Sequence, residues 1–400
     1  MRRQSNKFYL YLIIYGLVVA SLYHIFQPPN NFRNGHLADA NEYVKIYDFF
    51  EGDTETYQVR FGIHNRLVIP ILASILPGDQ PELSFFLVNS LFAILSLLAI
   101  FYLMQSFKIN QTFILLSICY FSLHWVGPFR QNAIDPINVD MAVYFFEVIF
   151  LVLFIKRKYW VLLILAPIVI AIKEIFLALL VVFLVVGILW RFFFKDKSIS
   201  IPWIFGILIL GISTKVVLNY FYPSVSPGRN SLIVMAFHTR EMILNPDHLL
   251  RWILSLFAAF GGFLFLIIKK PKKLSFNPEN KLILHILTLS VLSLSILGGM
   301  DYTRLIFLGF PYVMISIILI GKPGFIEFII AFIISIILTR FWLILPDPSA
   351  SMKLYNNWAP EISDWNHLLL WILTAFGSFL IFLAGRKLVA FRASSPQKPV

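Results

Sequence analysis

Long apolar segments dominate this chain, and they constrain its fold more than any other feature. A helix needs about 20 residues to cross the roughly 30 Å hydrocarbon core of a bilayer. Eight segments approach that length, at residues 8–26, 83–104, 201–220, 249–268, 282–298, 305–320, 325–344 and 368–383. Four shorter apolar runs lie at residues 112–125, 140–155, 159–172 and 175–190. We therefore predict an all-α integral membrane protein with about 12 transmembrane helices, within a range of roughly 11–13.

Composition supports a membrane protein and argues against a soluble one. Of the 400 residues, 59% are hydrophobic and 14% are charged, with a mean hydropathy of +0.80, whereas soluble domains are about 45–50% apolar and about 25% charged. We expect one polytopic domain over residues 1–390 and a cytoplasmic tail over 391–400. The single cysteine, Cys119, excludes an intramolecular disulfide and a cysteine-based metal cluster.

The basic residues indicate how the chain is oriented. With the N-terminus inside, short inner loops such as 156–158 and 269–273 carry clusters of lysine and arginine, which favours cytoplasmic placement of both termini. The net charge of +12 is then a topology signal, so we expect membrane lipids and no nucleic acid as partners. We expect a multi-pass protein of a bacterial cytoplasmic membrane. Residues 18–20 would suit signal-peptide cleavage, leaving eleven spans, but the basic start favours an uncleaved anchor.

The long loops all fall on the outer side in this topology. They cover residues 27–82, 222–248 and 345–366, whereas the inner loops are short. We therefore expect any site at the outer face. In the first outer loop, a short apolar run at 67–76 predicts a helix lying in the membrane interface.

The first outer loop also carries the strongest candidate for a general base. Asp39, Glu42 and Tyr43 recur at three- and four-residue spacing, which places them on one face of a helix. A carboxylate near the membrane surface can accept the proton of an attacking hydroxyl. The alternative is that Asp39 only caps the helix. The acids that follow, from Asp48 to Glu55, are typical of a solvated face.

Basic residues follow in the same loop, where Arg60, His64 and Arg66 precede the interfacial helix. A guanidinium binds phosphate through paired hydrogen bonds, so the two arginines suit an anionic head group. The alternative is ordinary anchoring to lipid phosphates.

Pairs of ionisable residues occur at two further places in the middle of the chain. Lys173 and Glu174 interrupt an apolar stretch, where such groups are costly and usually face a cavity or a partner. The alternative is that these two neighbours pair with each other. Asp135 and Asp140 lie in the outer loop between two short spans.

A tight outer turn brings Asp301 and Arg304 to the start of a span, ahead of Pro311. Arg304 could hold a lipid-linked phosphate with Asp301 orienting it, and a local ion pair without ligand is the alternative. Nucleotide-binding and zinc-protease motifs are not present in the sequence.

Four of these features, in this order and on one side, resemble the GT-C superfamily of multi-span glycosyltransferases that use polyprenyl-phosphate sugars. They are Asp39-x-x-x-Tyr43 in the first loop, Arg66-Leu-Val-Ile-Pro70, Lys173-Glu174, and Gly299-Met-Asp301-Tyr-Thr-Arg304. The resemblance implies sugar transfer at the extracytoplasmic face, with inversion. It also implies a role in glycan biosynthesis of the cell envelope.

The resemblance assigns residues to roles. Asp39 is implied as the base, with Glu42 as its substitute, and Arg60, Arg66, Lys173 and Arg304 as candidates for binding the donor phosphate. Tyr43, His64, Asp135, Asp140, Glu174 and Asp301 would support them. The expected partners are a polyprenyl-phosphate-linked sugar donor and a lipid-linked or polysaccharide acceptor. No cofactor is predicted; the first loop has no Asp-x-Asp pair, although its acids remain compatible with a divalent metal.

Two other classes of protein stay open. A multi-span transporter or flippase for a lipid-linked glycan would carry inverted repeats and broken helices at the midplane. A glycan polymerase would share much of the outer site.

Overall fold

The computed structural model describes residues 2–29, 39–77, 80–195, 199–226, 231–268, 279–297, 301–347 and 352–394, and helices are the only regular elements in these ranges. The first half of the chain forms α1 (Arg2–Phe26), α3 (Ala40–Glu51), α4 (Val68–Ser74), α5 (Pro81–Ser106), α6 (Gln111–Leu123), α7 (Pro128–Ile134), α8 (Asp140–Ile155), α9 (Tyr159–Ile170) and α10 (Ile175–Phe194). The second half forms α11 (Ile201–Phe221), α12 (Ser231–Leu244), α13 (Pro246–Phe260), the 3-10 helix η1 (Gly261–Ile268), α14 (Glu279–Leu297), α15 (Tyr302–Leu308), α16 (Phe310–Gly321), α17 (Phe325–Leu338), α18 (Met352–Asn356) and α19 (Trp365–Ser394).

Seven segments of the described chain are long and apolar enough to cross a membrane. They are Lys7–Phe26, Pro81–Ser106, Gln111–Ile134, Ile175–Phe193, Ile201–Phe221, Pro246–Ile268 and Trp365–Leu388. Shorter apolar helices lie at Tyr159–Ile170, Leu284–Ile296 and Phe325–Leu338. The all-helical, multi-span fold is therefore confirmed, whereas the number of twelve spans stays a prediction. The run at 175–190, taken as short from the sequence, continues to Phe194.

One predicted span is bent. The run 305–320 forms α15 and α16, whose axes differ by 70° across Gly309. Pro311 lies in the first turn of α16, where it cannot donate a backbone hydrogen bond and would clash with a preceding helical turn. A side chain at Gly309 would meet Val291 Cγ1 at 2.6 Å, so the bend also brings the backbone close to α14.

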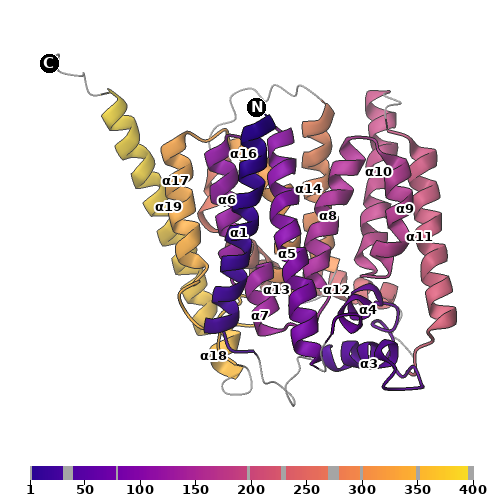
Figure 1. Cartoon of the computed structure of the whole chain (residues 1–400). Helices are drawn as coiled ribbons and strands as arrows, with labels where there is room; N and C mark the ends of the chain where they lie inside the picture. Colours follow the sequence, from indigo (N-terminus) through magenta and orange to yellow (C-terminus); the bar gives the residue numbers. More distant parts are fainter. Residues whose placement is uncertain are drawn as a thin grey trace.

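The helices run between two ends of the bundle (Figure 1). α1 begins and α19 ends at the same end, which we call the terminal end. The short helices α3, α4, α7 and α18 lie toward the opposite end, which we call the loop end (Figure 1). The short first-loop helices predicted from the sequence are thus present, as α3 and α4. Residues 298–300 of the predicted turn before Asp301, and residues 395–400 of the predicted tail, fall outside the described residues.

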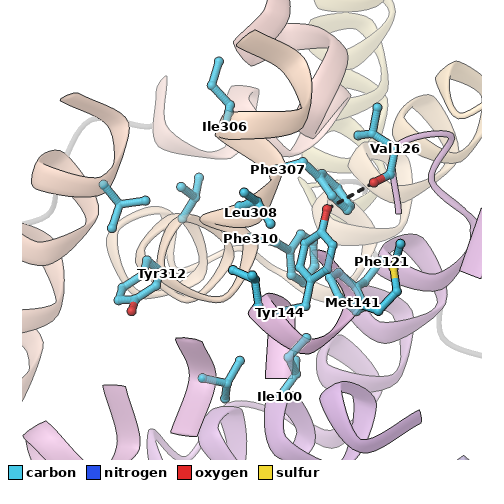
Figure 2. Close-up of a cluster of buried hydrophobic side chains, with 14 of the residues drawn as sticks. Ile100, Phe121, Val126, Met141, Tyr144, Ile306, Phe307, Leu308, Phe310 and Tyr312 are labelled. Atoms are coloured by element: carbon cyan, nitrogen blue, oxygen red, sulfur yellow. Dashed lines mark hydrogen bonds between the residues drawn. The ribbon is translucent and has the colours of Figure 1, made fainter. Parts of the chain in front are cut away.

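Aromatic side chains fill the core between α6, α8, α15 and α16. Phe121 stacks on Phe307 at 5.7 Å between ring centroids, and Phe310 lies 4.9 Å from Phe121. Tyr144 from α8 packs edge-on against Phe121 and donates a 3.1 Å hydrogen bond to the Val126 carbonyl, as Figure 2 shows. These buried rings hold α15 and α16 against α6 and α8. They therefore also fix the position of Arg304 in α15.

Candidate functional site

Asp39 stands at the N-terminus of α3, but it does not cap the helix through its side chain. The carboxylate makes no capping hydrogen bond. It instead pairs with the guanidinium of Arg60, which lies in the loop between α3 and α4. Both side chains are about half exposed, Asp39 at 50% and Arg60 at 46%. Glu42 lies one turn further on and accepts 2.8 Å hydrogen bonds from Lys45 Nζ and from the Arg60 backbone N–H. The capping alternative is therefore wrong for the side chain of Asp39.

Arg66 joins the first loop to the start of α10. Its Nε donates to Glu174 Oε2 at 3.0 Å and its Nη2 to Glu174 Oε1 at 2.6 Å, a two-pronged pair, while Nη1 donates to the Tyr43 hydroxyl at 2.9 Å. Burial raises the pKa of Glu174, but the Arg66 guanidinium outweighs this effect and holds that pKa at about 2. The Arg66 guanidinium, predicted to bind the donor phosphate with lipid anchoring as the alternative, thus lies in an internal ion pair in the structure.

Lys173 and Glu174 do not pair with each other. Lys173 Nζ instead donates to Asp140 Oδ1 at 2.5 Å. The other Asp140 oxygen lies 3.6 Å from Arg304 Nη1, and Arg304 Nε donates to Asp301 at 2.7 Å. The chain of charges therefore runs Lys173–Asp140–Arg304–Asp301 and links α8 and α15 to the turn between α9 and α10. The local Asp301–Arg304 pair expected as an alternative is present, but it is only one end of this chain.

Asp135, at the C-terminus of α7, lies near both the charge chain and the first loop. Burial raises the pKa of its carboxyl to about 7; the Arg304 guanidinium opposes this rise, and the negative charges of Asp140 and Asp39 add to it. Because charges from α3, α8 and α15 all act on this one carboxyl, they lie near it. The predicted residues from five separate segments thus gather in one region, which we call the outer cluster: Asp39, Glu42, Tyr43, Arg60, Arg66, Asp135, Asp140, Lys173, Glu174, Asp301 and Arg304.

Glu361 belongs beside this cluster, although no sequence motif pointed to it. Its Oε1 accepts from the Thr303 N–H at 3.0 Å, and its Oε2 accepts from Thr303 Oγ1 at 2.7 Å and Ser255 Oγ at 2.9 Å. Arg251 donates to the backbone carbonyl of Ser363 at 2.8 Å and so holds this part of the loop before α19. Glu361 therefore ties the loop to the residue just before Arg304.

The stability of the protein should depend on pH through Glu361. Burial, and then the negative charge of Asp301, raise the pKa of this carboxyl to about 7, above its value of about 4.3 in an unfolded chain. Between these two values the folded protein holds a proton that the unfolded chain has released, so stability falls as pH rises from about 4 to about 7. We expect Glu361→Gln to flatten this decline in thermal unfolding measured from pH 4 to pH 8. An unchanged slope would contradict the protonated state of Glu361 in the folded protein.

Three other polar groups lie outside the outer cluster. His64 bonds Asn219 of α11, with 2.9 Å between its Nε2 and the amide oxygen, so the residue predicted to support phosphate binding instead ties the first loop to that helix. Arg130 is fully buried. Glu147, in α8, is buried and its Oε2 has no hydrogen-bond partner in the described part of the chain.

A second acidic group lies on the exposed surface of the first loop. One carboxylate oxygen from each of Asp48, Glu51 and Asp53 comes within 4.8 Å of the others. Carboxylate oxygens are the ligands that calcium and magnesium prefer. None of these residues contacts a member of the outer cluster in the hydrogen bonds and ion pairs of the described chain, so this group remains a solvated acidic face.

The fold and the site define a class of protein: an all-helical, multi-pass membrane protein with a cluster of acids and bases at one end of its bundle. No protein-family model, no curated protein and no solved structure matches the chain. The functional argument therefore rests on the chain's own geometry.

Proposed function

We propose that the chain is a membrane glycosyltransferase that moves a sugar from a polyprenyl-phosphate carrier to a hydroxyl acceptor at the extracytoplasmic face. The observation that carries the proposal is the convergence of four cations and six carboxylates from distant segments at the loop end. Ion pairs cost free energy when they are withdrawn from water. Ionisable groups inside a membrane bundle are therefore rare and commonly mark a functional site. The resemblance to the GT-C superfamily supports the same function.

The proposed reaction is a single displacement. The acceptor oxygen attacks the anomeric carbon, the bond from that carbon to the phosphate oxygen breaks, and polyprenyl phosphate leaves with the bonding electrons. Asp39 takes the proton of the acceptor hydroxyl. Its exposure, 50% of the side chain, leaves it open to an acceptor that approaches from outside the membrane. One displacement inverts the configuration of the sugar.

The cations have room for a phosphate. Arg304 is 40% exposed, and of its donors only Nε and Nη1 contact carboxylates. Lys173 uses one of its three donors on Asp140. Positive charge placed where the leaving phosphate develops its second negative charge stabilises the transition state. Two nitrogens of Arg66 donate to Glu174 and the third to the Tyr43 hydroxyl, so we assign it to holding Tyr43 and the first loop in place.

A transporter or flippase for a lipid-linked glycan is the second candidate. The observation that favours it is the Glu147 carboxyl, buried within α8 with an oxygen that lacks a partner among the described residues. Carboxyls at such depth often mark ion or proton pathways.

An assay in detergent separates the two candidates. Purified protein should transfer a labelled sugar from a polyprenyl-phosphate donor to a lipid-linked or polysaccharide acceptor without a sealed compartment or an ion gradient. Activity that occurs only as movement across intact vesicles, with Glu147→Gln abolishing it, would favour transport and contradict sugar transfer.

A further inference from the structure

A second site lies on the flank of the bundle, apart from the outer cluster. A cavity of about 470 Å³ is bounded by α1 and by the segment after α17. Its walls are almost entirely apolar and include Leu22, Tyr23 and Phe26 on one side and residues 341–344 on the other. We call it the lateral groove. Its volume falls in the range of about 300–1,000 Å³ that is usual for small-molecule sites.

The lateral groove opens toward lipid. Phe26, Trp342 and Ile344, which line it, expose 67%, 55% and 61% of their surfaces. α1 is a long apolar helix suited to cross the membrane, and a surface of this kind on such a helix contacts hydrocarbon chains. Val19 to Gln27, at the C-terminal end of α1, line the groove, and α1 ends at the loop end of the bundle (Figure 1). Tryptophan is enriched between hydrocarbon and head groups at the ends of membrane spans, a preference that suits Trp342 beside the end of α1.

Two arginines adjoin this groove: Arg130 contacts two of its lining residues, and Arg340 directly precedes the lining residue Phe341. Arg130 donates to the amide oxygen of Gln27 at 3.3 Å and to the carbonyl of Leu343, both lining residues. It also donates to the carbonyl of Arg340 at 3.2 Å. Both guanidinium carbons lie over the Trp358 ring, at 5.0 Å for Arg130 and 5.2 Å for Arg340. Two positive charges thus share one aromatic ring.

Neither arginine has a negative partner among the residues that the structure describes. Arg130 is 0% exposed, and its hydrogen bonds go to neutral oxygens. By contrast, Arg60, Arg66, Lys173 and Arg304 of the outer cluster each pair with a carboxylate. Cation–π contacts stabilise a guanidinium by about 0.5–2 kcal/mol, which is small against the cost of keeping two like charges at low dielectric.

We infer that the lateral groove binds an anionic phospholipid of the surrounding membrane, with one acyl chain between α1 and residues 341–344 and the phosphate against Arg340. The apolar walls suit the chain, and the anion supplies the charge that the two arginines lack. Arg340 is only half-buried and makes the contact, while the buried Arg130 adds its positive field. The described residues place no carboxylate here to accept a proton, so the site suits binding rather than transfer chemistry. It does not depend on the proposed function.

Quenching of Trp342 by lipids with brominated acyl chains tests this inference. The protein is reconstituted in nanodiscs with increasing fractions of brominated phosphatidylglycerol or brominated phosphatidylcholine. The Trp342 signal is the difference between the unmodified protein and Trp342→Phe. We expect Trp342 to be half-quenched at a fraction of brominated phosphatidylglycerol about fivefold lower than that of brominated phosphatidylcholine. This factor is the increase in affinity that one arginine contact with an anionic head group gives. Trp365, 64% exposed at the start of α19, is the control and should show no preference.

Two variants decide the role of the charge. Arg340→Gln should abolish the preference for phosphatidylglycerol at Trp342, and Arg340→Lys should retain it. The circular dichroism spectrum of each variant verifies folding, and the lipid preference of the unmodified protein at Trp342 against that at Trp365 carries the test if Arg340→Gln does not fold. Equal quenching by both lipids, or equal preference at Trp365, would overturn the inference. Displacement of the brominated lipid by polyprenyl phosphate far better than by phosphatidylglycerol would also overturn it, in favour of a carrier-lipid site.

Discussion

Asp39→Asn is expected to reduce the turnover of sugar transfer by about 10²–10⁴-fold, the usual contribution of a positioned general base. The fold should survive, because the Asp39 side chain makes no capping hydrogen bond and asparagine is as favourable as aspartate at this position. The lost pair with Arg60 is about half exposed, and such pairs contribute less than about 1 kcal/mol. Turnover in detergent and the thermal unfolding midpoint should be measured on the same preparation.

Glu42→Gln is the matched control for Asp39→Asn. It removes a carboxylate one turn further along α3, whose hydrogen bonds to Lys45 and to the Arg60 backbone occupy it structurally. We expect at most a tenfold loss of turnover from this change. A well-folded Asp39→Asn protein with nearly normal turnover would remove Asp39 from the mechanism and transfer the role of base to Glu42 or Asp135.

Asp140→Asn is expected to destabilise the protein by about 3 kcal/mol, at the lower end of the range for removing one partner of a buried ion pair. The Asp140 carboxylate contacts both Lys173 and Arg304, and its side chain is only 12% exposed. Its loss leaves Lys173, in the turn before α10, without a counter-charge, and leaves Arg304 of α15 with Asp301 alone. Equilibrium unfolding in mixed micelles measures the effect.

Asp140→Asn combined with Lys173→Met should recover part of this loss, because the double change removes one of the stranded cations together with its partner. Asp39→Asn, which breaks an exposed pair, should cost less than about 1 kcal/mol in the same assay. Equal effects of Asp140→Asn and Asp39→Asn would contradict the buried charge chain.

Local patterns in the sequence predicted the helices well. The three- and four-residue spacing after Asp39 predicted α3, and apolar runs of about 20 residues predicted most of the long helices. Both signals are local, since they depend on helical periodicity and on the length of apolar segments. The bend between α15 and α16 has a local signal in Pro311, but its size depends on the rings of α6 and α8 that pack against it.

The pairing of charges could not be predicted in the same way. Lys173 and Glu174 are neighbours in sequence, yet adjacent side chains at a helix start point in different directions. Each therefore meets a partner brought close only by the fold, Asp140 for Lys173 and Arg66 for Glu174. Glu361 had no signal at all, because a single acid in a loop gains its role only from the tertiary contacts with Thr303 and Ser255.

Photo-crosslinking with a donor analogue tests the central claim most directly. A polyprenyl-phosphate sugar with a diazirine on the carbon next to the phosphate would be irradiated with the protein in detergent, and the labelled peptides mapped by mass spectrometry. The proposed function predicts labels around Lys173 and around Arg304, lost when unlabelled donor competes. Labels confined to α1 and residues 341–344, or labels insensitive to competition, would contradict donor binding at the outer cluster.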